Sequence, residues 1–129
     1  MATQAMCQPA NYGADIIIYS TTKFLSGHGN AMGGCVVDTG KFDWANNRGF
    51  EKLNEPDTSY HGIKFYETFG NLAYINFCHA CALRDLGTTM SPFNAYLTLT
   101  GIETLNLRMQ KHMFNAEKVA NFLINHNNV

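Results

Sequence analysis

ADIIIYSTTKFLSGHGNAMGGCVVD, residues 14–38, is the stretch that decides the fold. It opens with a β-branched apolar run, which predicts a strand over residues 14–20 that is buried on both faces, as in a parallel sheet. A second β-prone run predicts a strand over residues 33–38. The segment between them is rich in glycine. We therefore expect two strands flanking a flexible loop, in an α/β fold.

The rest of the chain predicts a long loop and three helices. Residues 39–66 are polar and aromatic without a sustained period, which favours a loop with one helical turn. Apolar residues at three- and four-residue steps predict a helix over 67–86, closed by Gly87. Ser91-Pro92 is a strong helix start, which predicts a helix over 92–100, and apolar residues at three- and four-residue steps predict another over 102–126. Two strands are few for three helices, so we expect part of a larger α/β domain.

Composition excludes several classes of protein. Nine Lys+Arg against ten Asp+Glu give a formal charge of −1. No run of like charge marks a nucleic-acid binder or a polybasic membrane protein. The apolar runs are far shorter than the roughly 20 residues of a bilayer span, and the first ten residues lack the pattern of a secretory signal. We therefore expect a cytoplasmic protein with neither nucleic acid nor membrane as a partner.

Several residues that could have a functional role also have a simpler structural explanation. The four cysteines are expected to be reduced structural thiols, and Cys78-His79-Ala80-Cys81 offers only two thiol ligands on one helix face, so no metal ligand is predicted. His28 is expected to make a local hydrogen bond. Arg84 and Asp85 are expected to form a solvated ion pair, and Met109 and Met113 are expected to pack in the core.

Ser20-Thr21-Thr22-Lys23 carries the chemistry. A lysine at a strand end beside a sheet can be desolvated, which frees an amine that is able to form a Schiff base. Ser20 and Thr22 lie two residues apart, so on an extended backbone both hydroxyls face one side and can donate to a phosphate. A surface lysine beside hydroxyls that satisfy nearby amides is the alternative. The candidate catalytic residue is Lys23, and the candidate cofactor-binding residues are Ser20, Thr22 and Lys23.

Residues 13–29 resemble the cofactor-lysine segment of the Cys/Met-metabolism pyridoxal-phosphate enzymes, which have fold type I. The resemblance continues over residues 33–38, 55–62, 84–87, 91–95 and 101–109, and so covers essentially the whole chain. It implies that residues 1–129 are a fragment of the large, aspartate-aminotransferase-like cofactor-binding domain, with the last helix leading toward a C-terminal domain. Residues 55–62 and Asn94 most resemble O-acetylhomoserine sulfhydrylases.

The resemblance implies the following roles. Pyridoxal phosphate is the cofactor, Lys23 is the Schiff-base lysine, and Ser20 and Thr22 donate to the cofactor phosphate. O-acetyl-L-homoserine reacts with sulfide or a thiol to give homocysteine or methionine, with release of acetate. Methionine γ-lyase and cystathionine γ-synthase or γ-lyase activity are the alternatives within the family. The assembly implied is a homo-oligomer, a tetramer by resemblance.

The same resemblance implies that the chain is internal to a longer protein. The family's aspartate for the pyridine nitrogen, its upstream phosphate loop, its ring-stacking tyrosine and its carboxylate-binding arginine find no counterpart in these residues. We therefore expect the isolated chain to be a poor enzyme. A different class stays open, a non-catalytic fragment that acts only in cofactor binding or subunit assembly.

Two other motifs are disfavoured. Ser20-x-x-Lys23 fits penicillin-recognising acyl enzymes, but their companion Lys-Thr-Gly is absent, and Asp38-Thr39-Gly40 is the nearest sequence to it. Gly27-x-Gly29 suggests dinucleotide binding, but Met32 occupies the third glycine position.

Overall fold

A computed structural model describes residues 2–129, which divide into two compact units. Unit 1 contains residues 2–8, 19–35 and 91–129. Unit 2 contains residues 9–18 and 36–90. Unit 1 includes the predicted site residues Ser20, Thr22 and Lys23.

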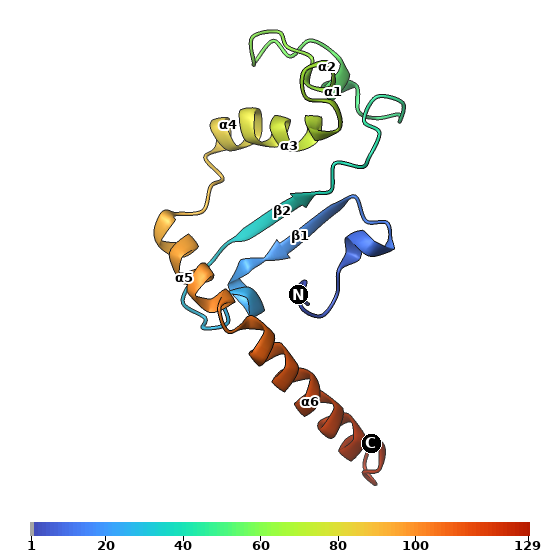
Figure 1. Ribbon diagram of the computed structural model, residues 1–129, viewed down its shortest axis with the longest axis vertical. Coiled ribbons are helices and arrows are strands. Elements are labelled where there is room, and N and C mark those ends of the chain that lie inside the picture. The colour runs from blue at the N-terminus through green and yellow to red at the C-terminus, as the bar shows by residue number, and fades with distance from the viewer. Residues whose placement is uncertain (1) are drawn as a thin grey trace. The chain divides into compact units, whose positions relative to one another are not determined.

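The two strands form a two-stranded antiparallel sheet. Strand β1 spans Ile16–Ser20 and β2 spans Gly34–Asp38, close to the predicted ranges 14–20 and 33–38. Thr21 N donates to Gly33 O at one end and Thr39 N to Asp15 O at the other, both at 3.0 Å, and the arrows run in opposite directions in Figure 1. The expected parallel arrangement is wrong because residues 21–33 reverse the chain without a crossover helix.

The strands are also less buried than their composition predicts. Ile17 is buried, but the Ile18 side chain is 76% exposed and Val36 and Val37 are each exposed by more than 40%. Residues 2–129 contain no third strand that could extend the sheet. The expectation of burial on both faces therefore fails in this chain, because a two-stranded sheet stays exposed unless other elements pack on its faces.

Unit 2 is built on an aromatic core. The predicted loop 39–66 contains a short helix, α1 (Glu51–Asn54), and the start of α2 (Phe65–Phe69), and a 3-10 turn, η1 (Pro9–Tyr12), precedes the sheet. Phe65 and Ala73 are fully buried, and Trp44 packs against them and donates from Nε1 to Asn71 O at 3.0 Å. The loop is thus ordered by aromatic packing, which a search for helical or strand periods does not detect.

The helix predicted over 67–86 is interrupted. Helix α2 ends at Phe69, and Gly70 then adopts φ 56°, which breaks the helix and begins a single turn, η3 (Gly70–Leu72). The chain continues through α3 (Ala73–Phe77), a wider turn, η4 (Cys78–Leu83), and α4 (Arg84–Leu86). Gly87 ends it with φ 66° and donates from its N to Leu83 O, as predicted.

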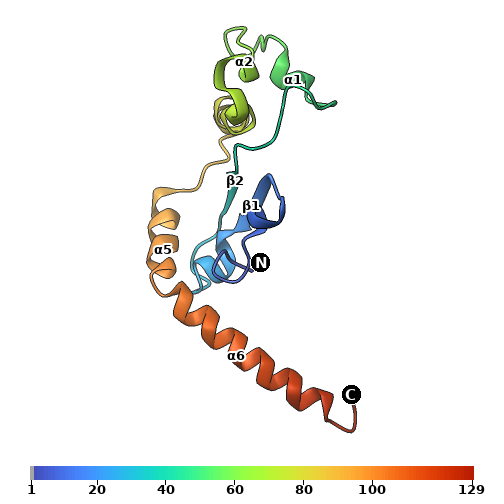
Figure 2. The ribbon, with the colours of Figure 1, turned by 45° about the vertical axis from the view of Figure 1, so that its right-hand side comes forward.

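Unit 1 contains the two longest helices. Helix α5 spans Pro92–Ile102 and α6 spans Leu105–Ile124, and Figure 2 shows them meeting at a corner. Ser91 caps α5 as predicted, its side chain accepting from Asn94 N at 3.2 Å. Leu105 and Met109 of α6 pack with Leu25 as the core of this unit.

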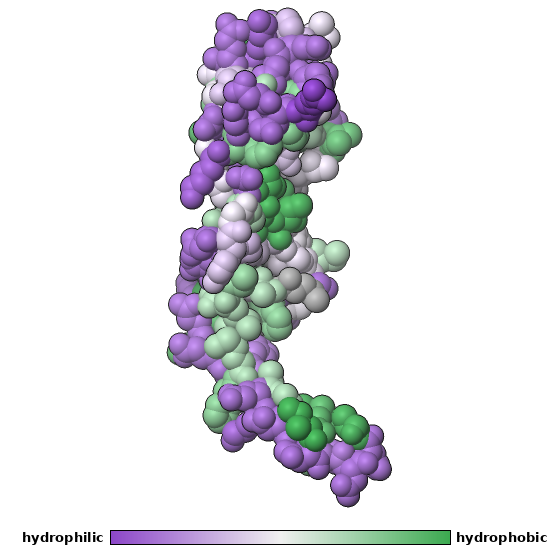
Figure 3. Space-filling view, turned by 90° about the vertical axis from the view of Figure 1, so that its right-hand side faces the viewer, coloured by the Kyte–Doolittle hydropathy of each residue, from purple (hydrophilic) through white to green (hydrophobic). Residues whose placement is uncertain are grey.

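Beyond Met109, the apolar side chains of α6 are not covered. Met113 is 46% exposed, so the core role expected for it is wrong within the described residues. Figure 3 shows hydrophobic side chains gathered at the lower end of the view, where α6 lies. The exposed apolar residues of α6 are Leu107, Met113, Phe114, Val119, Phe122, Leu123 and Ile124.

The four cysteines are free thiols, but they are not all buried. Cys81 is buried and Cys78 is partly exposed, whereas Cys7 and Cys35 are exposed. Cys35 lies on β2, and its exposure follows from the missing cover of the sheet. No helix within residues 2–129 has both the length and the apolarity that a membrane crossing requires.

Candidate functional site

Lys23 lies on a tight turn that begins where β1 ends. The turn, η2 (Thr21–Leu25), is not regular, because Lys23 adopts φ −93° and ψ −124° inside it. Thr21 and Leu25 are buried at its two ends, and Ser26 N donates to Thr21 O at 3.0 Å. Local sequence explains this geometry: apolar and small side chains anchor the turn, while the long polar side chain of Lys23 points outward.

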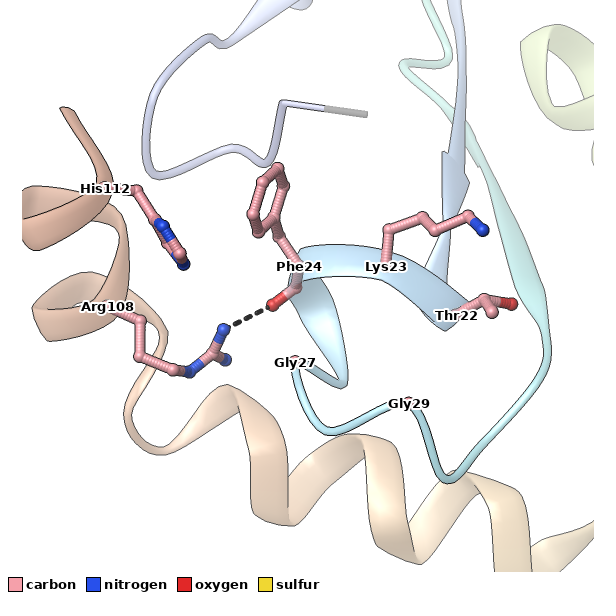
Figure 4. A pocket seen from close by; sticks show the side chains of 7 residues that line it. All are labelled: Thr22, Lys23, Phe24, Gly27, Gly29, Arg108 and His112. Carbon is pink, nitrogen blue, oxygen red and sulfur yellow. Dashed lines mark hydrogen bonds between the residues drawn. The ribbon is translucent and has the colours of Figure 1, made fainter. Parts of the chain in front are cut away.

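The turn forms one wall of a pocket of about 410 Å³. Figure 4 shows the Lys23 amine and the Thr22 hydroxyl on one side of the turn, and Phe24, His112 and Arg108 on the other. The Phe24 and His112 rings have centroids 5.1 Å apart. The lining comprises Thr22, Lys23, Phe24, Gly27, Gly29, Arg108 and His112. The structure thus brings two of the three predicted site residues into the lining, but not Ser20.

The Thr22 hydroxyl is engaged with the start of the second strand. It donates to Gly33 O at 3.2 Å and accepts from Gly33 N at 3.0 Å. The Ser20 hydroxyl has no hydrogen-bond partner among residues 2–129. The paired hydroxyls expected on one extended face are therefore not observed, because the chain leaves the strand at Thr21 and Thr22 instead ties the turn to Gly33.

The Lys23 side chain is exposed, and no carboxylate of residues 2–129 forms an ion pair with it. The desolvation that was expected from the adjacent strand is therefore not provided by this chain. The reason is again the small sheet, which leaves the strand end open to solvent. Lys23 is consequently accessible to a ligand that enters the pocket.

Arg108 and His112 are lining residues that sequence reasoning did not predict as part of the site. Both lie on α6, and Arg108 is 84 positions from its acceptor Phe24 O. Their four-residue spacing puts them on one helix face, but that face is indistinguishable from any solvated polar face in sequence. Only the packing of α6 on the turn reveals them.

The glycine-rich loop after the turn is held by its own polar contacts. His28 Nδ1 lies 2.7 Å from Ser26 O, which confirms the local hydrogen bond expected for it. Ser26 Oγ lies 3.2 Å from Asn30 Oδ1. Asn94 at the start of α5 donates to Met32 O at 3.1 Å. The loop is therefore fixed to α5 as well as to the strands.

The described residues whose pKa is clearly shifted lie in unit 2. Arg84 Nε donates to Asp85 Oδ1 at 2.7 Å, and this hydrogen bond raises the pKa of Arg84 and lowers the pKa of Asp85. The predicted solvated ion pair is confirmed, since both side chains are exposed. The Ser59 hydroxyl lowers the pKa of the buried Asp57 by donating to it at 2.5 Å. No cluster of three metal-ligating side chains occurs in residues 2–129.

Lys23 and Ser20 fit one end of pyridoxal phosphate, the cofactor that the resemblance implies. The aldehyde requires a free amine, and the phosphate requires N–H or O–H donors. The exposed Lys23 supplies the amine, and the unpartnered Ser20 hydroxyl is available as a donor. Thr22 would have to release Gly33 O to donate. These residues can therefore anchor the cofactor, whereas the described residues do not surround its ring.

Known proteins are similar to nearly the whole of this chain. The chain is 48% identical to the O-acetyl-L-homoserine sulfhydrylase of Leptospira meyeri, over 98% of this chain and 30% of that protein. It is also 48% identical to the homocysteine synthase of Schizosaccharomyces pombe, over 94% of this chain and 28% of that protein. The chain thus spans about 30% of the length of these relatives.

A solved structure shares the fold. It is a putative O-acetylhomoserine (thiol)-lyase from Campylobacter jejuni, and it contains N′-pyridoxyl-lysine-5′-monophosphate. The TM-score is 0.83 at 41% identity, over 93% of this chain and 29% of that one. The expected fold, part of the large domain of a fold type I enzyme, is therefore confirmed.

The family model of the Cys/Met metabolism PLP-dependent enzymes matches residues 1–129, the whole of this chain. This match settles the family, and the chain belongs to the Cys/Met metabolism PLP-dependent enzymes.

Proposed function

We propose that this chain is the cofactor-lysine part of a sulfhydrylase that converts O-acetyl-L-homoserine and sulfide or a thiol into homocysteine or methionine, with release of acetate. One observation carries the proposal: Lys23 presents an exposed amine in a pocket, on a turn whose ends are buried. The names of the relatives support the substrate class.

Lys23 has two tasks in this proposal. Its amine holds the cofactor covalently and, once the substrate amine has displaced it, moves protons between the substrate carbons. The bound cofactor supplies an electron sink for the substrate. Because Lys23 has no ion-pair partner among residues 2–129, its amine is free to reach and leave the substrate without breaking another contact.

Ser20 and Thr22 are proposed to bind the cofactor phosphate. Ser20 can donate at once because its hydroxyl is unpartnered. Thr22 can donate only after its hydroxyl turns away from Gly33 O, while it continues to accept from Gly33 N. The two hydroxyls are therefore expected to contribute unequally, with Ser20→Ala weakening cofactor binding more than Thr22→Val weakens it.

We also propose that the whole protein is a homo-oligomer. The support is the row of exposed apolar side chains on α6, since exposed apolar surface of this kind is typical of association sites.

The proposal is tested by incubating the chain with pyridoxal phosphate, recording the absorbance spectrum, reducing with borohydride and mapping the modified peptide. We expect one adduct, at Lys23. Lys23→Arg keeps the charge but cannot form the adduct, and Lys41→Arg is the matched control at another exposed lysine. Adducts scattered over Lys41, Lys52, Lys64 and Lys118, unchanged by Lys23→Arg, would refute the role of Lys23.

The substrate class is tested separately, on protein that has bound pyridoxal phosphate and has not been reduced. O-acetyl-L-homoserine is expected to change the cofactor spectrum as acetate is released, and sulfide is expected to restore the spectrum as it adds to the remaining carbon chain. A spectral change with methionine alone, accompanied by release of a thiol, would instead identify a γ-lyase.

A further inference from the structure

Arg108 is bonded to the backbone that immediately follows Lys23. Its Nη1 donates to Phe24 O at 2.9 Å, and its Nη2 lies 3.5 Å from Leu25 O. The same guanidinium donates to Gly101 O at 2.7 Å and to Thr104 Oγ1 at 3.1 Å. One side chain of α6 thus joins the lysine turn to the end of α5, as the dashed line to Phe24 in Figure 4 illustrates in part.

Two glycines make room for this arrangement. A Cβ on Gly27 would lie 2.5 Å from Arg108 Cζ, and a Cβ on Gly101 would lie 2.7 Å from the carbonyl carbon of Ser26. Carbon atoms in contact normally lie about 3.5–4.0 Å apart. The guanidinium and the turn are therefore packed more closely than any side chain at positions 27 or 101 would permit.

We infer that Arg108 is a positioning residue for Lys23, a guanidinium clamp that holds the Phe24 and Leu25 carbonyls and so fixes the turn from which the lysine reaches its cofactor. This inference rests on the proposed role of Lys23. It does not make Arg108 a catalytic residue, because the hydrogen bonds of its guanidinium all go to the protein itself.

The chemistry of arginine suits the clamp. A planar guanidinium presents five donors in a fixed fork, so it can serve several carbonyls in different directions and remains charged at any working pH. A lysine at position 108 keeps the charge, but its single ammonium cannot reach the same set of acceptors. Leu25 of the turn packs with Leu105 and Met109 of α6, which keeps the helix that carries Arg108 against the turn.

The first experiment compares Arg108→Gln and Arg108→Lys with the unmodified chain. Hydrogen exchange is measured at the amides of Ser26 and Gly27, which donate to Thr21 O and Lys23 O. Loss of hydrogen bonds from a charged group is expected to accelerate both amides by about tenfold or more in Arg108→Gln. The fraction of Lys23 trapped by borohydride at limiting pyridoxal phosphate is expected to fall by a similar factor, with Arg108→Lys intermediate.

The second experiment uses a matched glycine pair. Gly27 and Gly29 have nearly the same backbone φ, 74° and 67°, but a Cβ on Gly29 would meet nothing within 4 Å. Alanine at either position carries the same backbone strain, and only Gly27→Ala displaces the guanidinium. We expect Gly27→Ala to reduce Lys23 trapping at least about fivefold more than Gly29→Ala does. In the Arg108→Gln background this difference should shrink to about twofold or less, because the effects of substitutions at residues in contact are not additive.

Three outcomes would overturn the clamp: equal effects of the two glycine variants, an excess for Gly27→Ala that persists in Arg108→Gln, or exchange that accelerates throughout the chain rather than at Ser26 and Gly27. The last would mean a general loss of stability, which thermal unfolding followed by circular dichroism measures independently. If the unmodified chain shows no adduct at Lys23, the proposed function fails. The exchange rates then still decide whether Arg108 fixes the turn.

Discussion

Gly101→Ala is a substitution for which local propensity and tertiary packing predict opposite signs. Gly101 lies inside α5, and replacing glycine by alanine in a helix interior normally stabilises the helix by about 1 kcal/mol. The added Cβ, however, would lie 2.7 Å from the carbonyl carbon and 2.9 Å from the Cα of Ser26. Ser26 would have to retreat by about 1 Å to restore an ordinary contact.

The atoms that must move are backbone atoms of a buried residue, so the strain cannot be relieved by turning a side chain. Ser26 is fully buried, and its amide is bonded to Thr21 O. Overpacking of this kind costs about 1–3 kcal/mol, which exceeds the gain in propensity or at least cancels it. We therefore expect Gly101→Ala to lower the free energy of unfolding by up to about 2 kcal/mol, the difference between these ranges.

The assay is urea unfolding followed by circular dichroism at 222 nm, with slopes compared to exclude a change in the unfolding transition itself. Thr100→Ala is the control, because Thr100 is the exposed neighbour on the same helix and its substitution changes the helix propensity and removes only a local bond from Thr100 Oγ1 to Tyr96 O, without adding an atom toward Ser26. A stabilisation of about 1 kcal/mol by Gly101→Ala, as propensity alone predicts, would refute the close packing of the lysine turn on α5.

Three further outcomes are expected. Phe65→Ala should destabilise the chain by about 3–5 kcal/mol because Phe65 is fully buried, whereas Phe93→Ala, at a residue 68% exposed, should change stability by less than about 0.5 kcal/mol in thermal unfolding. Ser91→Ala should cost about 1 kcal/mol in urea unfolding through loss of the α5 cap, and a change near zero would contradict the capping bond to Asn94 N. The hydrogen bond from Ser59 lowers the pKa of Asp57, so this carboxylate contributes stability above its unfolded pKa near 3.8, and that stability is lost as pH falls through the lower folded pKa. Ser59→Ala should move the loss of stability at acid pH to higher pH. An unchanged pH dependence would rule out the hydrogen bond as the cause.

How far the sequence predicts the site depends on the range of each interaction. A local motif at the end of a strand made Lys23 and Thr22 candidate cofactor-binding residues, and both line the pocket, while their roles stay a prediction. Ser20 belongs to the same motif but lies outside the lining, because the chain turns at Thr21. Arg108 could not be predicted, since its carbonyl partners on the turn are more than eighty positions away.

The fold shows the same division. The cap at Ser91 and the stop at Gly87 were predictable because each involves residues within four positions of one another. The break at Gly70 was missed because apolar periodicity continues across it, while the backbone at this one glycine adopts a positive φ. The aromatic order of residues 39–66 was missed because Trp44 packs against residues such as Tyr74, far along the chain.

The sequence by itself determined the family, because a long motif at fixed spacing is a local property that survives without any knowledge of packing, and it made Lys23 the proposed cofactor lysine. Tertiary structure alone decided that the strands are antiparallel and largely exposed, that the Thr22 hydroxyl is already bonded to Gly33, and that Arg108 clamps the turn. The physical reason is that these features depend on which distant segments meet. Hydrogen bonds and contacts between such segments are set by how helices and strands pack, and no local propensity encodes that.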